Sequence, residues 1–269
     1  MNKTKKNSKI YKKKTIKKGG YLFLGPEECT LTEYNIDDKF TIIDMYAFAN
    51  CNKIKQLFIP NNIYEIKKNA FLNCSSLTSL TLPNSLKKIE ESALESCKKI
   101  VTINIPDKVV KIPNSLCKNC ISLKKVVLSP NIKLIGLMSF QNCIKLIDIN
   151  FPNNITQIQF SAFKNCKSLQ NINLSDNINT IDDQVFHNCI SIRKISLPLK
   201  LKKISSCLFK NCKKLEEVII KKNVKSISKD AFIGCINLKK IIIQDGISSY
   251  TLNFIKKNFA TIEIVILDL

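Results

Sequence analysis

Cysteine is the residue type in this sequence whose number and spacing could support chemistry, either as disulfides or as metal ligands. The chain has 12 Cys among 269 residues. Nine of them recur every 23 residues without an insertion or deletion: Cys51, Cys74, Cys97, Cys120, Cys143, Cys166, Cys189, Cys212 and Cys235. Each should occupy the same place in successive copies of one unit. Side chains stacked in this way point in one direction, which is a poor geometry for a disulfide. We therefore predict free, packed thiols, as in a reducing interior.

The pair Cys117 and Cys120 has the spacing of half a zinc site or of a redox motif. The repeat explains it better, because Cys120 belongs to the periodic set and Cys117 takes a place that most copies fill with Phe. Cys29 and Cys207 fall at other offsets and are predicted to be ordinary thiols. His187 is the only histidine and is expected on the surface. No catalytic residue, metal ligand or cofactor site is nominated, and the sequence favours a non-enzymatic protein.

The apolar residues share the 23-residue period. Counted from each Cys, position +3 is Ile or Leu, positions +6 and +8 are aliphatic or Phe, and position +15 is Ile in eight of nine copies. Position −3 is Phe in seven copies and position +9 is Pro in five. This pattern predicts a short strand at +6 to +8 with one face inward, ended by the Pro. A second extended piece follows at +12 to +15. The segment before Cys is expected to form a helical turn that places Phe and Cys inside.

One unit of this size cannot enclose its own apolar side, so the copies must stack and cover one another. Parallel pairing at about 4.8 Å would give a column of roughly 50 Å for some ten units. The predicted boundaries are a disordered Lys-rich tail at 1–20, a degenerate N-terminal capping repeat at 21–46, nine repeats at 47–253 and a C-terminal capping half-repeat at 254–269.

These residues carry a family resemblance. The order Leu/Ile-x-x-Leu/Ile-x-Leu/Ile-Pro, then Ile at +15, then Ala-Phe-x-x-Cys, resembles the BspA-like leucine-rich repeat over residues 24–269. The resemblance implies an α/β-type leucine-rich-repeat solenoid, made mostly of short parallel β-strands with helical turns and wound as a right-handed superhelix. It also implies a parallel sheet on the concave side and roles in adhesion, recognition or scaffolding. Many members of that family are secreted or surface-exposed.

The chain is strongly basic, with 43 Lys and Arg against 21 Asp and Glu. Nine Lys lie in the first 20 residues, and Arg193 is the only arginine. The excess of Lys either serves polyanions or reflects an AT-rich coding sequence, because the attraction of Lys for polyanions is generic. The candidate polyanion contacts are Lys12, Lys13, Lys14, Lys17 and Lys18.

No apolar run approaches the length of a membrane span, and no apolar segment follows the N-terminal charges. We therefore expect no signal peptide and an intracellular location, cytoplasmic foremost with the nucleus as the alternative.

The outward strand positions +5 and +7 form one continuous surface in a solenoid and are the natural place for a partner. Near the C-terminus, Ile219, Ile242 and Val265 form a row that marks either an interface or ordinary β-propensity. Position −1 is Asn in seven copies and is expected to hydrogen-bond the backbone of the adjoining turn. The predicted contacts with a protein partner of unknown identity are Phe58, Thr81, Asn104, Asp148, Asn150, Asn171, Asn173, Ser196, Ile219 and Ile242.

Three functions are consistent with this pattern. The first is a non-enzymatic interaction or scaffold protein that binds another protein through the concave strand face. The second is a protein that associates loosely with nucleic acid or an anionic membrane through the Lys-rich tail and the Lys residues of the convex side. The third is a surface adhesin exported by a route that the sequence does not show. Oligomeric state is not predicted.

Overall fold

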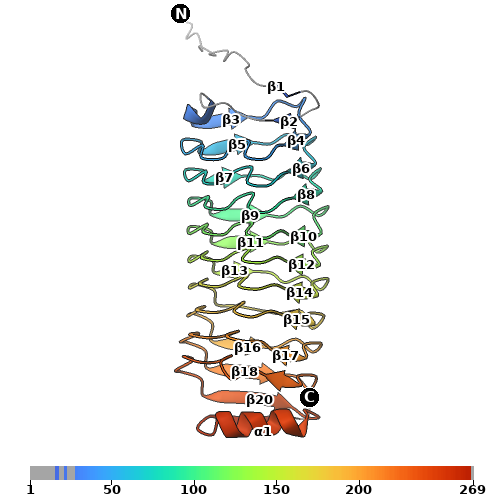
Figure 1. The fold of residues 1–269 in the computed structure, drawn as a ribbon, viewed down its shortest axis with the longest axis vertical. Helices are drawn as coiled ribbons and strands as arrows, with labels where there is room; N and C mark the ends of the chain where they lie inside the picture. Colours follow the sequence, from blue (N-terminus) through green and yellow to red (C-terminus); the bar gives the residue numbers. More distant parts are fainter. Residues whose placement is uncertain (1–15, 18–20, 23–27, 268–269) are drawn as a thin grey trace, which may run out of the picture.

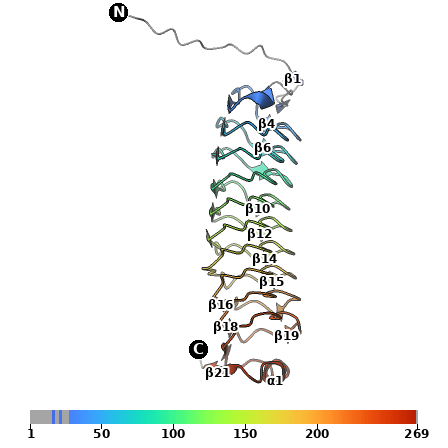
Figure 2. The same ribbon diagram turned by 90° about the vertical axis from the view of Figure 1, so that its left-hand side faces the viewer.

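The computed structural model describes residues 16–17, 21–22 and 28–267. The chain forms stacked coils, one for each 23-residue repeat, in an elongated column (Figures 1 and 2). Neighbouring coils pair in parallel with residues 23 positions apart, for example Lys125 with Asp148. The fold class predicted from the sequence, a repeat solenoid of short parallel strands, is confirmed. Most of the predicted tail, including Lys12, Lys13, Lys14 and Lys18, lies outside the described residues, and the side chain of Lys17 is not described.

Most coils contribute two short strands on different sides of the column; the coil of Cys166 has only an isolated bridge, from Asn171 to Asp148, in place of the first. Strands of the first series begin at position +5: β3 (Glu33–Asn35), β5 (Gln56–Phe58), β7 (Ser79–Leu80), β9 (Thr102–Asn104), β11 (Lys125–Val127), β13 (Asp148–Ile149), β16 (Lys194–Ser196), β18 (Glu217–Ile220), β20 (Lys240–Gln244) and β21 (Glu263–Leu267). Strands of the second series end at position +15: β4 (Ile42–Ile43), β6 (Glu65–Ile66), β8 (Lys88–Ile89), β10 (Lys111–Ile112), β12 (Leu134–Ile135), β14 (Gln157–Ile158), β15 (Thr180–Ile181), β17 (Lys203–Ile204) and β19 (Ser226–Ile227). At the N-terminal end, β1 (Ile16–Lys17) pairs antiparallel with β2 (Tyr21–Leu22), which pairs with β4.

The inward positions of both strands form one core along the column. In β9, Ile103 is buried between the exposed Thr102 and Asn104, as the alternation predicts. Burial of an aliphatic side chain of this size stabilises the fold by about 1.5–3 kcal/mol. Because each coil repeats the same apolar set, most of the stability comes from contacts between successive coils.

The segment before each Cys is a run of tight turns. In the first repeat, Ala47 N–H donates to the Asp44 carbonyl at 3.2 Å and Cys51 N–H donates to the Phe48 carbonyl at 3.1 Å. Position −1 has a positive φ in every one of these turns, for example 63° at Asn165, and position −5 does so in eight, for example 55° at Ser161. Asn tolerates this left-handed conformation better than most residues. The requirement explains why Asn recurs immediately before Cys.

The side chains of these Asn residues form a ladder, and this corrects the expectation that they bond to the backbone. The Asn165 amide donates to Asn142 Oδ1 at 2.7 Å and accepts from the Asn188 amide at 2.8 Å. The same contact joins Asn142 to Asn119 and Asn73 to Asn50. An amide carries both a donor and an acceptor, so identical amides stacked one per coil can satisfy each other.

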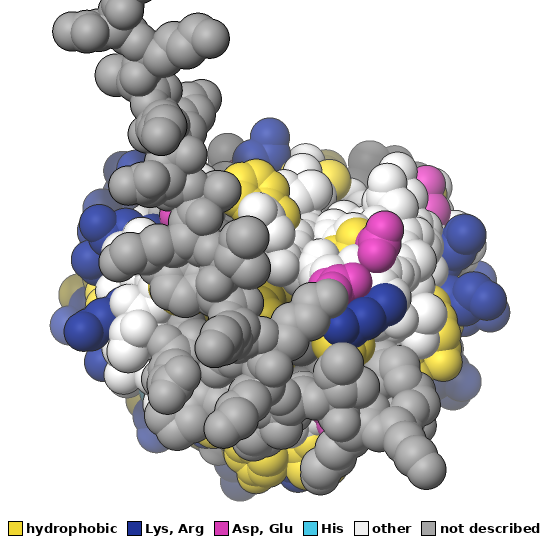
Figure 3. All heavy atoms as spheres, turned by 90° about the horizontal axis from the view of Figure 1, so that it is seen from above, with side chains coloured by type: hydrophobic (Ala, Val, Ile, Leu, Met, Phe, Trp, Pro, Cys, Tyr) yellow, Lys and Arg dark blue, Asp and Glu magenta, His cyan; other side chains and the backbone are white. Residues whose placement is uncertain are grey.

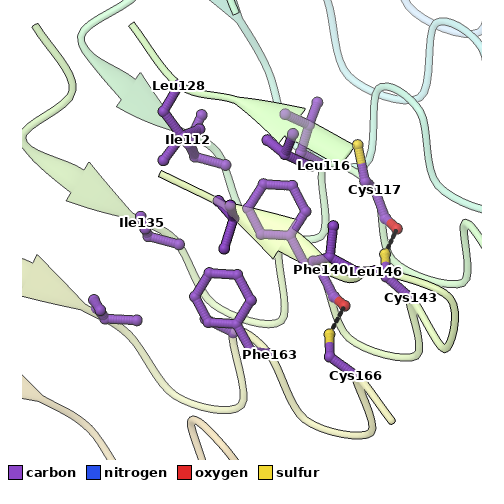
Figure 4. Packing of buried hydrophobic residues seen from close by; sticks show 14 of the residues in the cluster. Ile112, Leu116, Cys117, Leu128, Ile135, Phe140, Cys143, Leu146, Phe163 and Cys166 are labelled. Carbon is purple, nitrogen blue, oxygen red and sulfur yellow. Dashed lines mark hydrogen bonds between the residues drawn. The ribbon is translucent and has the colours of Figure 1, made fainter. Parts of the chain in front are cut away.

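The periodic thiols have a structural role that accounts for their recurrence. All of them except Cys51 donate to the carbonyl of position −3 in the preceding coil, as Cys143 Sγ does to Cys117 and Cys166 Sγ does to Phe140 (Figure 4), at 3.1 and 3.2 Å. Cys is small enough for the core and provides a weak donor there. Free thiols are confirmed for Cys74, Cys97, Cys117, Cys120, Cys143, Cys166, Cys189, Cys207, Cys212 and Cys235.

The prediction of free thiols is wrong for Cys29 and Cys51, which form a disulfide with Cα atoms 4.5 Å apart. Cys29 lies one residue beyond the periodic position, which Glu28 occupies in its coil. Its side chain therefore does not share the direction of the column of Cys residues. The geometric argument against bonding stacked Cys residues does not apply to this pair.

Phe side chains at position −3 stack face to face through the C-terminal half of the column. Ring centroids of Phe140 and Phe163 are 5.4 Å apart, and the series continues through Phe186, Phe209 and Phe232 at 5.5–5.7 Å. Figure 4 shows Phe140 and Phe163 among the buried side chains of the core. Near the N-terminal end Phe48 and Phe71 stack in the same way, at 5.2 Å. Tyr34 meets Phe48 edge-on and Phe259 meets Phe232 edge-on, both at 5.7 Å.

The last coil differs from the sequence expectation. Helix α1 (Ser249–Asn258) replaces the extended piece predicted at its positions +12 to +15, which are residues 247–250. Ser248 caps the helix by accepting from Thr251 N–H, and Lys256 and Lys257 lie in its last turn, where the helix dipole favours cations. The helix lies beside β21 at the end of the column (Figures 1 and 2), where its buried Ile255 extends the core.

The Asn ladder and its backbone conformation can be separated by substitution. We expect Asn165→Ala to lower the free energy of unfolding by about 2 kcal/mol, because it removes two amide bonds and strains a left-handed residue. Asn165→Gly removes the same bonds without the strain and should cost about half as much. Urea unfolding of the full chain measures both. Equal stability of the two variants would contradict the account.

Candidate functional site

The strand face, defined as positions +5 and +7 of the first strand series, carries the predicted contact residues. Seven of the ten are exposed: Phe58, Thr81, Asn104, Asp148, Asn150, Asn171 and Asn173. Ser196 and Ile219 are half-buried. Ile242 was expected to be exposed and is buried. It lies in register between Ile219 and Val265, whose branched side chains cover it from both sides.

Both strand series are interrupted twice, and the interruptions coincide. The first series is divided between β7 and β9 and again between β13 and β16; the second is divided between β8 and β10 and again between β15 and β17. We call the boundary between residues 74–96 and 97–119 the first seam, and that between 166–188 and 189–211 the second seam. Within the described residues, the column therefore consists of three blocks of paired strands.

Missing backbone hydrogen bonds define the seams. In regular coils the N–H of position +4 donates to the carbonyl of position +4 in the preceding coil, as Lys124 does to Val101 at 2.8 Å and Glu216 does to Arg193 at 2.7 Å. The equivalent N–H groups at the seams, those of Val101 and Arg193, make no such bond in the described part of the chain.

Two residues at position +16 contribute to the gaps. Elsewhere this N–H donates to the Ile of the preceding coil, as Asp182 does to the Ile158 carbonyl at 2.9 Å. At the first seam the position is Pro113, which has no N–H. At the second seam the hydroxyl of Ser205 bonds the Ile181 carbonyl instead, at 2.6 Å.

The turn edge, formed by the segments at −6 to −1, stays bonded across both seams. At the first seam Leu94 N–H donates to the Leu116 carbonyl at 2.9 Å, and at the second Phe186 N–H donates to the Leu208 carbonyl at 3.0 Å. The second seam also keeps a loop contact from Lys200 N–H to the Asp176 carbonyl, at 3.2 Å. Each seam therefore opens toward the strands and is closed at the turns.

A cavity lies on the strand face at each seam. The first-seam cavity, of 560 Å³, is lined by hydroxyl and amide side chains that include Thr81, Thr102 and Asn104, together with Asp107. The second-seam cavity, of 660 Å³, is lined by Gln170, Asn171, Asn173, Ser191, Arg193, Lys194, Ser196 and Lys214, with Ile172 and Leu174. A further cavity of 610 Å³ opens on the opposite strand series at the second seam, between Asp182 and Lys203.

The predicted Asn residues divide into two kinds. The Asn150 amide donates to the Leu128 carbonyl at 3.1 Å and accepts from Leu128 N–H at 2.8 Å, so it substitutes for strand pairing. In contrast, the side chains of Asn104, Asn171 and Asn173 make no hydrogen bond to other described residues and are exposed. The seams therefore bring together the predicted residues that have free donors and acceptors.

Sequence reasoning missed Gln170, Ser191, Arg193 and Lys214 as lining residues because it did not anticipate the seams. Pro113 was the available signal for the first seam, since it stands where the other repeats need an N–H. Nothing comparable marks the second seam. The Arg193 guanidinium donates to Glu216 Oε1 at 2.6 Å, and the Lys194 ammonium is paired with Glu217 Oε1 at 2.6 Å.

The titratable groups in the core are held in their neutral forms. Burial raises the pKa of the Cys166 and Cys212 thiols, and it raises that of Cys235 to about 12. For Cys117, a hydrogen bond with Cys120 and then burial raise the pKa. Thiolates are the reactive and metal-binding form of Cys. No group of three or more His, Cys, Asp or Glu in the described ranges is placed to hold a metal ion.

The shifted pKa values of His187 and Asp230 each have a local physical cause. The pKa of half-buried His187 is lowered, first by burial and then by Lys164 and Lys210. The pKa of Asp230 is lowered because it accepts hydrogen bonds from Ser228, Ser206 and Cys207. Asp230 thereby supplies an acceptor to the Cys207 backbone where the regular turn contact is missing, which is a structural role.

Comparison with protein families gives a match over nearly the whole column. The model described as "BspA type Leucine rich repeat region (6 copies)" matches residues 20–147 and 133–260. The chain belongs to the BspA-type leucine-rich repeat family. This confirms the resemblance seen in the repeat. Leucine-rich repeat proteins of this family generally act in protein interaction or adhesion. A comparison with curated proteins gives no match.

Solved structures share the fold of this BspA-type repeat protein at low sequence identity. A leucine-rich cell surface protein from Faecalibacterium prausnitzii is 20% identical, with 89% of this chain and 80% of that chain covered and a TM-score of 0.52. The pneumococcal vaccine antigen PcpA is 19% identical, with 89% and 68% covered and a TM-score of 0.55. The leucine-rich repeat protein TpLRR of T. pallidum is 16% identical, with 92% and 90% covered and a TM-score of 0.50. Among the described residues, no helix is long and apolar enough to cross a membrane.

The seams can be detected by hydrogen exchange. We expect the amides of Val101 and Arg193 to exchange faster than those of Lys124 and Glu216, which hold the same position in regular coils and donate to the coil before. Exchange followed by NMR on the full chain measures all four. Equal protection at the four sites would mean that the sheets are continuous.

Proposed function

We propose that this protein is a non-enzymatic interaction protein that binds a protein partner through the strand face. One observation carries the proposal. Three side chains that make no hydrogen bond to other described residues line cavities on one exposed face: Asn104, Asn171 and Asn173. The family's general association with protein interaction supports it.

The contrast with other Asn residues strengthens the proposal. Most Asn in the repeats are used internally, either in the ladder at −1 or by bonding a loop carbonyl of the preceding coil, as Asn131 and Asn177 do at 2.9 and 3.0 Å. A free amide has two donors and an acceptor with two lone pairs. Asn104, Asn171 and Asn173 add nothing to the column through such bonds, so their hydrogen-bonding capacity is open to a partner.

The strand face also offers apolar contact beside these amides. Phe58 is 55% exposed and Val127 is 38% exposed on the same series of strands. Mixed polar and aromatic surfaces of this kind are typical of protein interfaces. Such a face suits a macromolecular partner better than a small ligand, because its cavities are shallow and spread along the column.

Affinity capture with matched variants tests this function. We expect Asn173→Lys and Asn104→Lys to remove the proteins that the unaltered chain retains, because a long cation displaces a neutral donor and acceptor at the contact. Asn153→Lys makes the same charge change at an exposed loop position away from the strand face and should retain them. Mass spectrometry identifies the retained proteins. Identical retention by all four proteins would contradict a role for the strand face.

Association with polyanions is a second candidate, favoured by a row of Lys residues just after the periodic Cys. These residues are exposed and make no ion pair in the described part of the chain: Lys53, Lys98, Lys99, Lys145, Lys167, Lys213 and Lys214. Viewed along the axis from the N-terminal end, Lys and Arg side chains lie around the rim of the column (Figure 3).

Heparin chromatography tests this second candidate. We expect retention at low salt and elution as salt rises, because the contact would release counterions. The triple variant Lys98→Gln, Lys99→Gln, Lys145→Gln should elute at lower salt than the unaltered chain. Absence of retention at low salt would remove the candidate.

A further inference from the structure

We propose that the second-seam cavity on the strand face binds an extended acidic segment of the protein partner, with a carboxylate held by Arg193 and Lys214. This inference rests on the proposed function and names the chemistry of the segment bound. It follows from three independent features of the cavity: open backbone groups, unengaged amides and a lining whose charged side chains are all positive.

The open backbone groups suit a polypeptide. Arg193 N–H and the Gln170 carbonyl would bond each other in a regular coil, as Glu216 N–H and the Arg193 carbonyl do at 2.7 Å. At the second seam this bond is missing, and both groups border a cavity of 660 Å³. An extended peptide presents alternating N–H and C=O groups, so it can satisfy a strand edge that the fold leaves unpaired.

The amides around these backbone groups extend the same chemistry. Gln170, Asn171 and Asn173 all line the cavity, are exposed and make no side-chain hydrogen bond to other described residues. Each carries donors and acceptors for a peptide main chain. Half-buried Leu174 also lines the cavity and supplies apolar contact for the side chains of a bound segment.

The charge of the cavity selects an acidic segment. Arg193, Lys194 and Lys214 line it, and no Asp or Glu does. The pairs Arg193–Glu216 and Lys194–Glu217 lie at the surface, where ion pairs contribute little, so a ligand carboxylate can replace their partners. Lys214 makes no ion pair within the described residues. The planar guanidinium of Arg193 matches a carboxylate with two parallel hydrogen bonds.

The first seam provides an internal comparison. Its cavity has the same backbone opening at Val101, but its polar lining consists of hydroxyls, amides and Asp107, with no Lys or Arg. An acidic segment is therefore unfavourable there. Comparison of the two seams therefore separates the contribution of an open strand edge to peptide binding from the contribution of positive charge.

Fluorescence anisotropy with the full chain tests the inference. The probes are a short labelled peptide of alternating Glu and Thr and its counterpart with Gln in place of Glu. We expect the Glu peptide to bind and the Gln peptide to bind about tenfold more weakly, since the carboxylate contacts are lost. The double variant Arg193→Gln, Lys214→Gln should weaken binding of the Glu peptide by about tenfold.

A matched control removes general charge attraction from the result. The double variant Lys87→Gln, Lys133→Gln loses the same charge from exposed positions outside the cavity and should bind the Glu peptide as the unaltered chain does. Equal loss in both double variants, no effect of either, or equal affinity for the two peptides would each overturn the inference. Retention of partners in the capture experiment, with loss on Asn104→Lys at the first seam, would then leave the proposed function standing without it.

Discussion

The whole structure depends on a constant spacing of 23 residues between equivalent positions of successive coils. Almost every contact that holds the column joins residues about one repeat apart: Asn165 with Asn142, Phe163 with Phe140, Cys166 with Phe140, and Lys194 with Glu217. A single coil buries too little apolar surface to be stable alone. One inserted residue would move the ladder, the ring stack and the thiol contacts out of register together. This dependence explains why nine periods follow one another without an insertion.

The period made most of the fold predictable, because spacing alone shows which side chains lie inside. Ile103 and Cys166 are buried as their positions require. The sequence did not reveal what the repeated polar residues bond to, since Asn165 satisfies an identical neighbour and that choice depends on distances between coils. The disulfide of Cys29 was not predicted either, because Cys29 lies outside the 23-residue pattern from which the prediction was made. Helix α1 replaces a strand where the repeat loses its Ile at Tyr250 and gains a capping Ser248.

The candidate site was predictable in part. Exposed positions +5 and +7 follow from alternation, so Asn104, Asn171 and Asn173 could be named from the sequence. Their grouping at two cavities could not, because it arises where hydrogen bonding between coils fails. Asn150 shows the difference, since an identical residue at an equivalent position is used to hold Leu128. The site thus lies where the fold departs from its repeat. The repeat pattern in the sequence does not show where such departures occur.

The seams also give the column an uneven response to force. The turn edge is bonded from coil to coil, while both strand sides are interrupted at the same two levels. Such a column bends most easily where the strand sides separate at a seam while the turn edge stays bonded. Each block then moves as a rigid body. Tension along the axis would concentrate at these two levels, since fewer bonds resist it there. A partner that bound across a seam would connect the two blocks and make the column stiffer at that level.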